Sequence, residues 1–517
     1  MPRLPVSGGP TCVAENAKLS AHIPYLIHCP YTALSNLSIL PPRFDVRKRR
    51  GKPLSSSAFL AWAGCLWLAV FLASVPQLAS LLSMSRMAVA QNCPAFNPAP
   101  CQPPKGDAFY TIPSAASLTN SAVGSIITYR PQPYIPPAFL PGASGLTAWT
   151  VKYVTKNAQG IKTAAITTIV VPSNPSGRIL SYQAAYDSAD LDCSPSYQLG
   201  NHQNNINNFT EPLNFEMGIM ALVLDKNWTV IVPDYEGLTA SFASGLTSGQ
   251  AVLDGITAAY NSGSFSRINS SYRVALAGYS GGSLATEWAG ELLASYAPSL
   301  SASIVGVAAG GIPVNLNNSI TLVNGPTSDN SRPVCLIPNA LQGLASTYPA
   351  FASYLNSNLI PSKIGAFNYS QNSCNDNAYY QGQDIFATYF KPNATLAAFT
   401  SGEPYKSVLN TTGIMGKHGR PTRPTYFFQG ATDMIAPAFA VTNLYNSYCA
   451  NPAGLSLEYT LNPNTGHADE AVSGLGGAFQ FLQDRFDAKP SVTGCTMRTT
   501  EPSSTGFPAP TPYPSNF

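Results

Sequence analysis

The sequence predicts an α/β fold in which a mostly parallel central sheet is flanked by helices and carries a largely helical insertion. Short apolar runs rich in β-branched and aromatic residues alternate with stretches of helical periodicity, which is typical of parallel strands connected by helices. About 115 residues then separate the run that ends at Ala309 from the run that begins at Thr425. One helix and two loops need far fewer residues, and a structureless loop of this length is rare in a compact domain.

An inserted cap between Asn315 and Pro424 explains this long separation, and eight strands are expected around it. The expected strands are Trp149–Val154, Ala165–Val171, Ile179–Tyr182, Trp228–Val232, Val274–Ala277, Ile304–Ala309, Thr425–Gln429 and Leu457–Leu461. Eight strands with helical stretches between them suit one large sheet.

The pentapeptide Gly278-Tyr279-Ser280-Gly281-Gly282 is the most informative motif. It fits the G-x-S-x-G nucleophile elbow of α/β-hydrolases, where a serine sits on a sharp turn between a strand and a helix. An apolar strand precedes it, and Leu284, Trp288 and Leu292 follow at helical spacing. Without that context, the same five residues would be an ordinary glycine-rich turn. The sequence therefore predicts Ser280 as a nucleophile on an α/β-hydrolase fold.

A serine nucleophile needs a base, and in this fold the base follows it in the chain. Of the five histidines, only His418 and His467 come after Ser280. His467 lies just past an expected strand, where a catalytic loop is expected. His418 lies in a basic, glycine-flanked loop with no strand before it, which is typical of a solvated loop residue. We therefore expect His467 to be the base.

The third member should be an acid between the serine and the histidine. Asp433 directly follows the expected strand Thr425–Gln429, at the strand end where open α/β sheets place their chemistry. The alternative is a plain turn aspartate before Pro437. Asp234 also ends a strand, but it precedes Ser280 and is expected to be a structural turn acid.

Two more acids, Glu287 and Glu291, lie on the helix that follows the elbow. A solvated helix face is the expected place for both carboxylates. Neither is expected to take part in the chemistry.

The predicted mechanism is acyl transfer through the serine. His467 accepts the proton of Ser280 as the serine attacks an ester carbonyl, and Asp433 orients the imidazole. The oxyanion needs donors, one of which should be the backbone N–H of Gly281. The chain has no His-Gly-Gly-Gly motif, so the residues alone place the second donor only within the loop Gln183–Ser188.

The chain resembles the fungal secretory lipase family over roughly residues 105–490. The resemblance implies an α/β-hydrolase with an inserted cap that acts on triacylglycerols and other carboxylic esters without a cofactor. It also implies the triad Ser280, Asp433 and His467, and an oxyanion hole made by Asp187 and Gly281. The residues that carry it are Ser181-Tyr182, Tyr186-Asp187-Ser188, Leu191–Tyr197, Val232–Gly237, Gly278–Gly282 with Glu287-Trp288-Ala289, Gly430–Asp433 and Gly466-His467.

The function expected from these observations is a secreted serine hydrolase that cleaves carboxylic esters, in the first place a triacylglycerol lipase. A short-chain carboxylesterase is the alternative, followed by a serine peptidase or a non-catalytic binding protein on the same fold. The expected partners are a lipid or ester substrate and a lipid–water interface. No obligatory protein partner is inferred.

Composition and motifs argue against other classes of function. After residue 90 the chain holds 19 basic and 23 acidic residues with no basic stripe, which argues against nucleic acid as a partner. No H-E-x-x-H motif and no cysteine set with zinc spacing is present, so no metal is expected.

The first 90 residues are expected to direct the chain out of the cytosol. A basic cluster, Arg47–Arg50, precedes an apolar run over residues 58–82, and Ala88-Val89-Ala90 forms a small-residue cleavage pattern. The run is either a secretion signal, with the mature enzyme starting near Gln91, or an uncleaved type II membrane anchor. The expected parts are thus a leader (1–90), a first core part (91–314), the cap (315–424), a second core part (425–496) and a Pro-rich tail (497–517).

Sequons and cysteines agree with an extracytoplasmic enzyme. Seven N-x-S/T sequons follow residue 90, and four of them lie in the cap, at Asn317, Asn368, Asn393 and Asn410. The seven cysteines of this part leave one thiol over. Sequence does not fix their pairing. We expect Cys449 with Cys495, and Cys193 with either Cys374 or Cys335.

The cap is also rich in aromatic residues. They could line a tunnel for an acyl chain, or they could simply form the core of the cap. The residues concerned are Phe367, Tyr379, Tyr380, Phe386, Tyr389 and Phe390.

Overall fold

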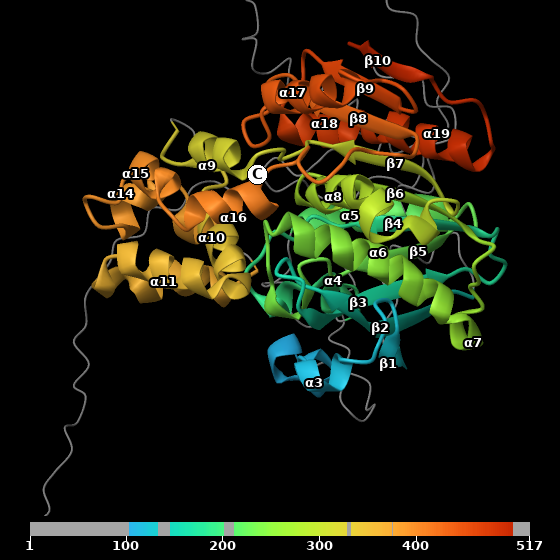
Figure 1. The fold of residues 1–517 in the computed structure, drawn as a ribbon, viewed down its shortest axis with the longest axis horizontal. Coiled ribbons are helices and arrows are strands. Elements are labelled where there is room, and N and C mark those ends of the chain that lie inside the picture. Colours follow the sequence, from blue (N-terminus) through green and yellow to red (C-terminus); the bar gives the residue numbers. More distant parts are fainter. Residues whose placement is uncertain (1–102, 133–144, 201–210, 328–331, 375, 500–517) are drawn as a thin grey trace, which may run out of the picture. The chain divides into compact units, whose positions relative to one another are not determined.

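The computed structural model describes residues 103–132, 145–200, 211–327, 332–374 and 376–499 (Figure 1). The expectations for the leader 1–90, for Cys93 and Cys101, for the sequon at Asn208 and for most of the tail fall outside these residues. Within the described part, no helix combines the length and apolar character that a membrane span requires.

The core is one ten-stranded sheet with the strand order β1-β2-β3-β5-β4-β6-β7-β8-β9-β10. The pairs from β1 to β5 are antiparallel, and all pairs from β5 through β4 to β10 are parallel. The strands are β1 (Ile126–Pro131), β2 (Thr147–Lys156), β3 (Lys162–Val171), β4 (Arg178–Gln183), β5 (Thr229–Pro233), β6 (Arg273–Tyr279), β7 (Ile304–Gly310), β8 (Thr425–Gly430), β9 (Ser456–Asn462) and β10 (Gly494–Arg498).

All eight predicted strands are present, and β1 and β10 are additional. Both additional strands lie at the edges of the sheet and are largely exposed, so they lack the apolar run that marks a buried strand. β10 ends at Arg498, so it includes the first two residues of the expected tail (497–517).

Helices cover both faces of the sheet (Figure 1). The side chains of α6, α8 and α17 pack on one face in a cluster that includes Ile256, Trp288 and Leu444. The side chains of α5, α18 and α19 pack on the other face. The core helices are α3 (Ala115–Leu118), α4 (Pro195–Gly200), α5 (Glu211–Leu224), α6 (Gly245–Asn261), α7 (Gly263–Ser266), α8 (Gly281–Tyr296), α17 (Ala438–Cys449), α18 (His467–Ser473) and α19 (Leu475–Phe486).

Between β7 and β8 the chain forms a group of helices, here called the cap, which lies together to one side of the sheet in Figure 1. Its side chains form their own hydrophobic cluster, and Phe242 and Ala243 of the core join it. The cap helices are α9 (Leu316–Val323), α10 (Leu336–Thr347), α11 (Pro349–Asn358), α12 (Ile364–Phe367), α13 (Asn377–Tyr380), α14 (Ile385–Tyr389), α15 (Leu396–Ser401) and α16 (Tyr405–Thr412).

Two disulfides confirm the expected pairing. Cys449 at the end of α17 bonds Cys495 in β10, and Cys193 bonds Cys374. The second bond ties the core loop that follows β4 to the cap. Among the described cysteines, Cys335 is the free thiol, and it is buried at the start of α10.

The prediction that Glu287 and Glu291 are solvated is wrong, because both carboxylates are buried beneath the segment in which the chain returns from the cap. Glu291 accepts hydrogen bonds from the backbone N–H groups of Gly416 (2.7 Å) and His418, and from the hydroxyl of Tyr448 (3.2 Å). Tyr448 also donates to Glu287 at 2.9 Å. Burial, with the neighbouring Glu291, raises the pKa of Glu287 well above its usual value. The partners lie more than 100 residues away, so the local helical pattern does not reveal them.

We predict that Glu291→Ala destabilises the protein by about 2–4 kcal/mol, because two backbone donors of the returning segment lose their acceptor. Urea unfolding followed by fluorescence measures the loss. Glu403→Ala is the control, since this exposed cap carboxylate accepts one hydrogen bond, from the N–H of Ser407. Equal losses in the two variants would contradict this role for Glu291.

Candidate active site

Ser280 lies on the turn between β6 and α8, in a backbone conformation that few residues adopt. Its φ of 55° and ψ of −127° project the side chain out of the strand-to-helix turn. The N–H of Ser280 bonds the carbonyl of Gly310 at the end of the neighbouring strand β7 (2.9 Å). This contact and the hydrogen bonds of α8 hold the turn in place.

Glycines around Ser280 are required by close backbone contacts. A Cβ at Gly278 would lie 2.4 Å from the carbonyl oxygen of Gly282. A Cβ at Gly282 would lie 1.9 Å from the carbonyl oxygen of Gln183 at the end of β4. A side chain at Gly278 would therefore push the start of α8 away from β6, and one at Gly282 would separate the elbow from β4.

The structure brings Ser280, His467 and Asp433 together from three strand ends. His467 Nε2 lies 2.8 Å from Ser280 Oγ, and His467 Nδ1 lies 2.7 Å from Asp433 Oδ2. The Asp433 side chain is buried, whereas the imidazole is partly exposed. With Nδ1–H donating to Asp433, Nε2 is free to accept the serine proton. Tyr279 of the elbow fixes the backbone of His467 by donating its hydroxyl proton to the His467 carbonyl (2.5 Å).

Asp433 is held rigidly by the loop after β8. Its Oδ1 accepts the N–H groups of Ile435 and Ala436, both at 2.8 Å. Its Oδ2 accepts a bond from Gln429 Nε2 at 2.9 Å beside the bond to His467. Sequence analysis missed Gln429. The available signal was its place inside an otherwise apolar strand, where a buried amide needs polar partners.

Gly281 and Asp187 lie beside Ser280. The N–H of Gly281 is the first of α8 and has no partner within its own helix. Asp187 follows β4 with a positive φ of 42°. A Cβ on Gly281 would lie 1.6 Å from Asp187 Oδ1, so the carboxyl group of Asp187 occupies the space directly over Gly281. That oxygen is buried, and no hydrogen bond to it is found among the described residues.

Further buried acids support the loop that carries Asp187. Glu216 of α5 accepts bonds from the N–H of Ala185 (3.0 Å) and from the hydroxyl of Tyr182 (3.1 Å). Burial raises the pKa of Glu216 well above its usual value, and it raises the pKa of Asp187 to about 7. A positively charged His467 has the opposite, smaller effect on Asp187. Sequence analysis gave no signal for Glu216, which lies more than 30 residues from its partners.

An apolar pocket opens over Ser280. It runs between the elbow and the cap helices α9 and α10, and aliphatic side chains form most of its wall. The lining residues are Asp187, Phe242, Ala243, Ser280, Gly281, Leu284, Pro313, Leu316, Ser319, Ile320, Val323, Leu336, Ile337, Ala340 and Ile435.

The aromatic residues that could have lined a tunnel are not among these lining residues. Phe367, Tyr380, Phe386, Tyr389 and Phe390 pack in the core of the cap, and Tyr379 is exposed. The cap core is therefore aromatic, and the pocket wall is aliphatic.

Other candidate residues lie elsewhere. His418 Nε2 contacts the carbonyl of Thr411 (2.9 Å) in the returning segment of the cap, outside the pocket. Asp234 is buried and accepts bonds from the N–H (2.8 Å) and hydroxyl (2.5 Å) of Ser196, a structural role as expected.

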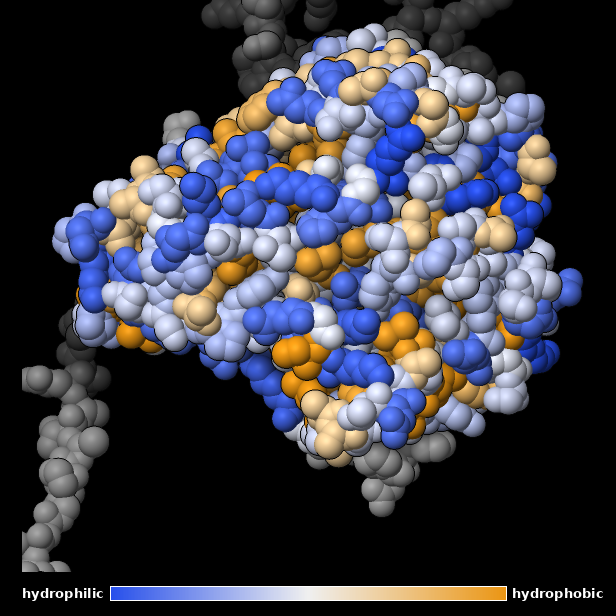
Figure 2. All heavy atoms as spheres, viewed as in Figure 1, coloured by the Kyte–Doolittle hydropathy of each residue, from blue (hydrophilic) through white to orange (hydrophobic). Residues whose placement is uncertain are grey.

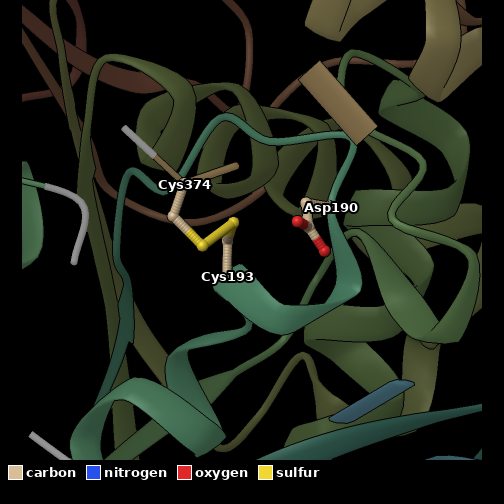
Figure 3. Close-up of side chains that lie close together, drawn as sticks. All are labelled: Asp190, Cys193 and Cys374. Carbon is tan, nitrogen blue, oxygen red and sulfur yellow. A yellow bond between two sulfur atoms is a disulfide. The ribbon is translucent and has the colours of Figure 1, made fainter. Parts of the chain in front are cut away.

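Asp190, Cys193 and Cys374 form a cluster of metal-ligating types (Figure 3). The two sulfur atoms are joined in the disulfide, so neither is available as a thiolate. Asp190 pairs with Lys105 at 2.8 Å. The cluster is therefore a structural connection between the core and the cap.

Comparison with known proteins identifies the family. The sequence profile of the secretory lipase family matches residues 202–494. Lipase 5 of Candida albicans is 33% identical over 398 residues, which cover 76% of this chain and 83% of the relative. The trichothecene C-3 esterase of Fusarium sporotrichioides is 32% identical over 426 residues, covering 77% of this chain and 87% of the relative. The crystal structure of Candida antarctica lipase A in its closed state aligns with a TM-score of 0.68 at 26% identity, covering 80% of this chain and 93% of that one.

The buried acids predict that the folded protein is more stable at mildly acidic pH than at neutral pH. Burial raises the pKa of Asp187, Asp234, Asp254 and Asp376 to about 7, whereas the same carboxyls in the unfolded chain ionise near pH 4. The folded state thus binds more protons between pH 4 and 7, and the free energy of unfolding falls as pH rises through this window. We expect the midpoint of thermal unfolding to drop by roughly 5 °C or more between pH 5 and pH 8.

Asp254→Asn tests the origin of this slope, because Asp254 is buried far from Ser280 and accepts bonds from Thr155 and Tyr296. The variant should lose part of the pH dependence. A midpoint that rises from pH 5 to pH 8 in the parent protein would contradict the assignment.

Proposed function

The chain belongs to the secretory lipase family, and we propose that Ser280, His467 and Asp433 are the catalytic triad with which it hydrolyses triacylglycerols. Membership makes the protein a carboxylic ester hydrolase. The observation that carries the proposal is the 2.8 Å contact between Ser280 Oγ and His467 Nε2 at the floor of an apolar pocket.

The contacts support a two-step acyl transfer. Ser280 Oγ attacks the ester carbonyl carbon while its proton passes to His467 Nε2. The tetrahedral intermediate collapses, and the alcohol leaves with that proton. A water molecule then gives its proton to His467 and attacks the acyl-enzyme, which releases the fatty acid and returns the proton to Ser280. Asp433 holds the imidazole in the required tautomer throughout.

Gly281 and Asp187 are the proposed oxyanion hole. The N–H of Gly281 lies at the N-terminus of α8, where the helix dipole also favours negative charge. One well-placed donor of this kind lowers the barrier by about 3 kcal/mol. Asp187 is the second proposed member, on a loop that Glu216 holds. Gly281 cannot be larger, because Asp187 occupies the space over it.

The pocket favours long acyl chains over short ones. Its wall consists mostly of aliphatic side chains from the elbow region and from α9 and α10. Each methylene that leaves water for such a wall contributes about 0.8 kcal/mol. A short-chain carboxylesterase is the second candidate, since one relative is named as an esterase of a trichothecene.

We further propose that the enzyme acts outside the cytosol, with residues 1–90 as the leader and the mature chain starting near Gln91. The two disulfides suit an oxidising compartment. The sequons at Asn227, Asn269, Asn393 and Asn410 lie at exposed positions, where a glycan can be attached. A membrane anchor in place of a cleaved signal remains the alternative for the leader.

Substitution of the triad tests the assignment of roles. Ser280→Ala and His467→Ala should each lower kcat for p-nitrophenyl butyrate by roughly 10⁴-fold or more, because the nucleophile or its base is lost. His418→Ala is the control and should stay within about twofold, because its contacts are outside the pocket. Equal losses in His467→Ala and His418→Ala would contradict the assignment of His467 as the base.

Chain length tests the lipase against the esterase. Hydrolysis of p-nitrophenyl esters from acetyl to palmitoyl, with emulsified triolein alongside, should favour the long chains, because only these fill the apolar pocket. Activity confined to acetyl and butyryl esters would make the enzyme a carboxylesterase.

A further inference from the structure

We infer that Met434 and Phe439 form a docking surface by which the enzyme binds an uncharged lipid surface beside its pocket. The inference rests on the proposed function, because it concerns how a water-insoluble ester reaches Ser280. The two residues are here called the docking pair.

The docking pair is exposed although large apolar side chains are normally buried. The Phe439 side chain, in the first turn of α17, is 58% exposed, the highest value among large hydrophobic residues of the described part. Met434 is 50% exposed. Exposed apolar residues often mark an interaction site when they lie beside a binding pocket or an active site.

The pair adjoins the pocket through a short stretch of chain. Met434 directly follows Asp433, whose Oδ2 bonds His467. Ile435 then lines the pocket together with Ser280. Within seven residues, the loop and the start of α17 thus provide the buried acid, a pocket wall and two exposed apolar side chains. A lipid surface in contact with Met434 and Phe439 would lie next to the lining of the pocket.

Charge favours a neutral lipid as the occupant over an anionic membrane. From Pro424 to Leu457, Asp433 is the single residue of the Lys, Arg, Asp and Glu types, and its carboxylate is buried against His467. No Lys, Arg, Asp or Glu occurs between Leu292 and Ser328, the stretch that contains α9 on the cap side of the pocket. Charges are costly to bring against an apolar phase, and basic residues would attract an anionic one. These two stretches of chain contribute neither effect.

Ile112 is an exposed apolar residue that does not adjoin the pocket. Figure 2 shows hydrophobic residues at several places on the face of the molecule that it presents, among hydrophilic ones. Ile112, 45% exposed, precedes α3, and α3 and α17 lie at opposite ends of the core in Figure 1. Ile112 is therefore a suitable control, with similar exposure and no connection to the pocket.

The test measures binding to lipid separately from chemistry. In a Ser280→Ala background, which leaves the lipid intact, co-flotation with phosphatidylcholine vesicles that carry triolein is compared for the parent, Phe439→Ser, Met434→Ser and Ile112→Ser. We expect Phe439→Ser and Met434→Ser to weaken partitioning, by about tenfold for Phe439→Ser, and Ile112→Ser to leave it unchanged. Binding should change little with salt or with added anionic lipid.

Matched activity measurements separate this inference from the proposed function. With Ser280 intact, Phe439→Ser should lose activity on emulsified triolein and keep the parent rate on dissolved p-nitrophenyl butyrate. Loss of both activities with an unchanged melting temperature would show that Phe439 acts on the reaction itself, and would overturn the docking role. A parent enzyme inactive on every ester would instead refute the proposed function.

Three binding outcomes would also overturn the inference. One is equal partitioning of the parent, Phe439→Ser and Met434→Ser. The second is binding that requires anionic lipid. The third is binding that appears only after residues 500–517 are removed, which would mean that the chain itself covers the docking pair.

Discussion

The site depends on the close approach of three backbone segments at Ser280. The elbow has a positive φ, and it contacts the end of β4 through Gly282 and the end of β7 through the N–H of Ser280. The contact with β4 is possible only because Gly282 provides no Cβ. The two contacts together place the serine hydroxyl, the first amide of α8 and the Asp187 loop within one small region. Catalytic geometry of this kind tolerates little displacement, since a shift of about 1 Å can cost a hundredfold in rate.

Most of the core was predictable from the sequence because its signals are local. Parallel strands buried on both faces read as apolar runs, so the eight central strands and the strand ends that carry Ser280, Asp433 and His467 could be identified. The edge strands β1 and β10 could not, because neither contains a buried residue. The order of nucleophile, acid and base along the chain then selected His467 over His418 before any geometry was known.

The features that sequence reasoning missed all depend on partners distant in the chain. In the sequence, Glu291 has the spacing of a residue on a solvated helix face. In the fold, the backbone N–H groups of Gly416 and His418 bind its carboxylate. In the sequence, Gln429 is an ordinary strand residue, and only the fold brings its side-chain amide to the carboxylate of Asp433. The pocket wall is aliphatic because α9 and α10 face the elbow, whereas the more conspicuous aromatic residues fill the interior of the cap. Periodicity identifies which face of a helix is buried, but it does not identify the opposing surface.

The position of Asp187 has a consequence for the chemistry. Its carboxyl group lies against Gly281 in a site with little water, which is why burial raises its pKa to about 7. In the proposed mechanism, an ionised carboxylate there would repel an oxyanion held by Gly281, whereas the protonated form would not. The surroundings that would keep water away from this oxyanion therefore also disfavour negative charge on Asp187.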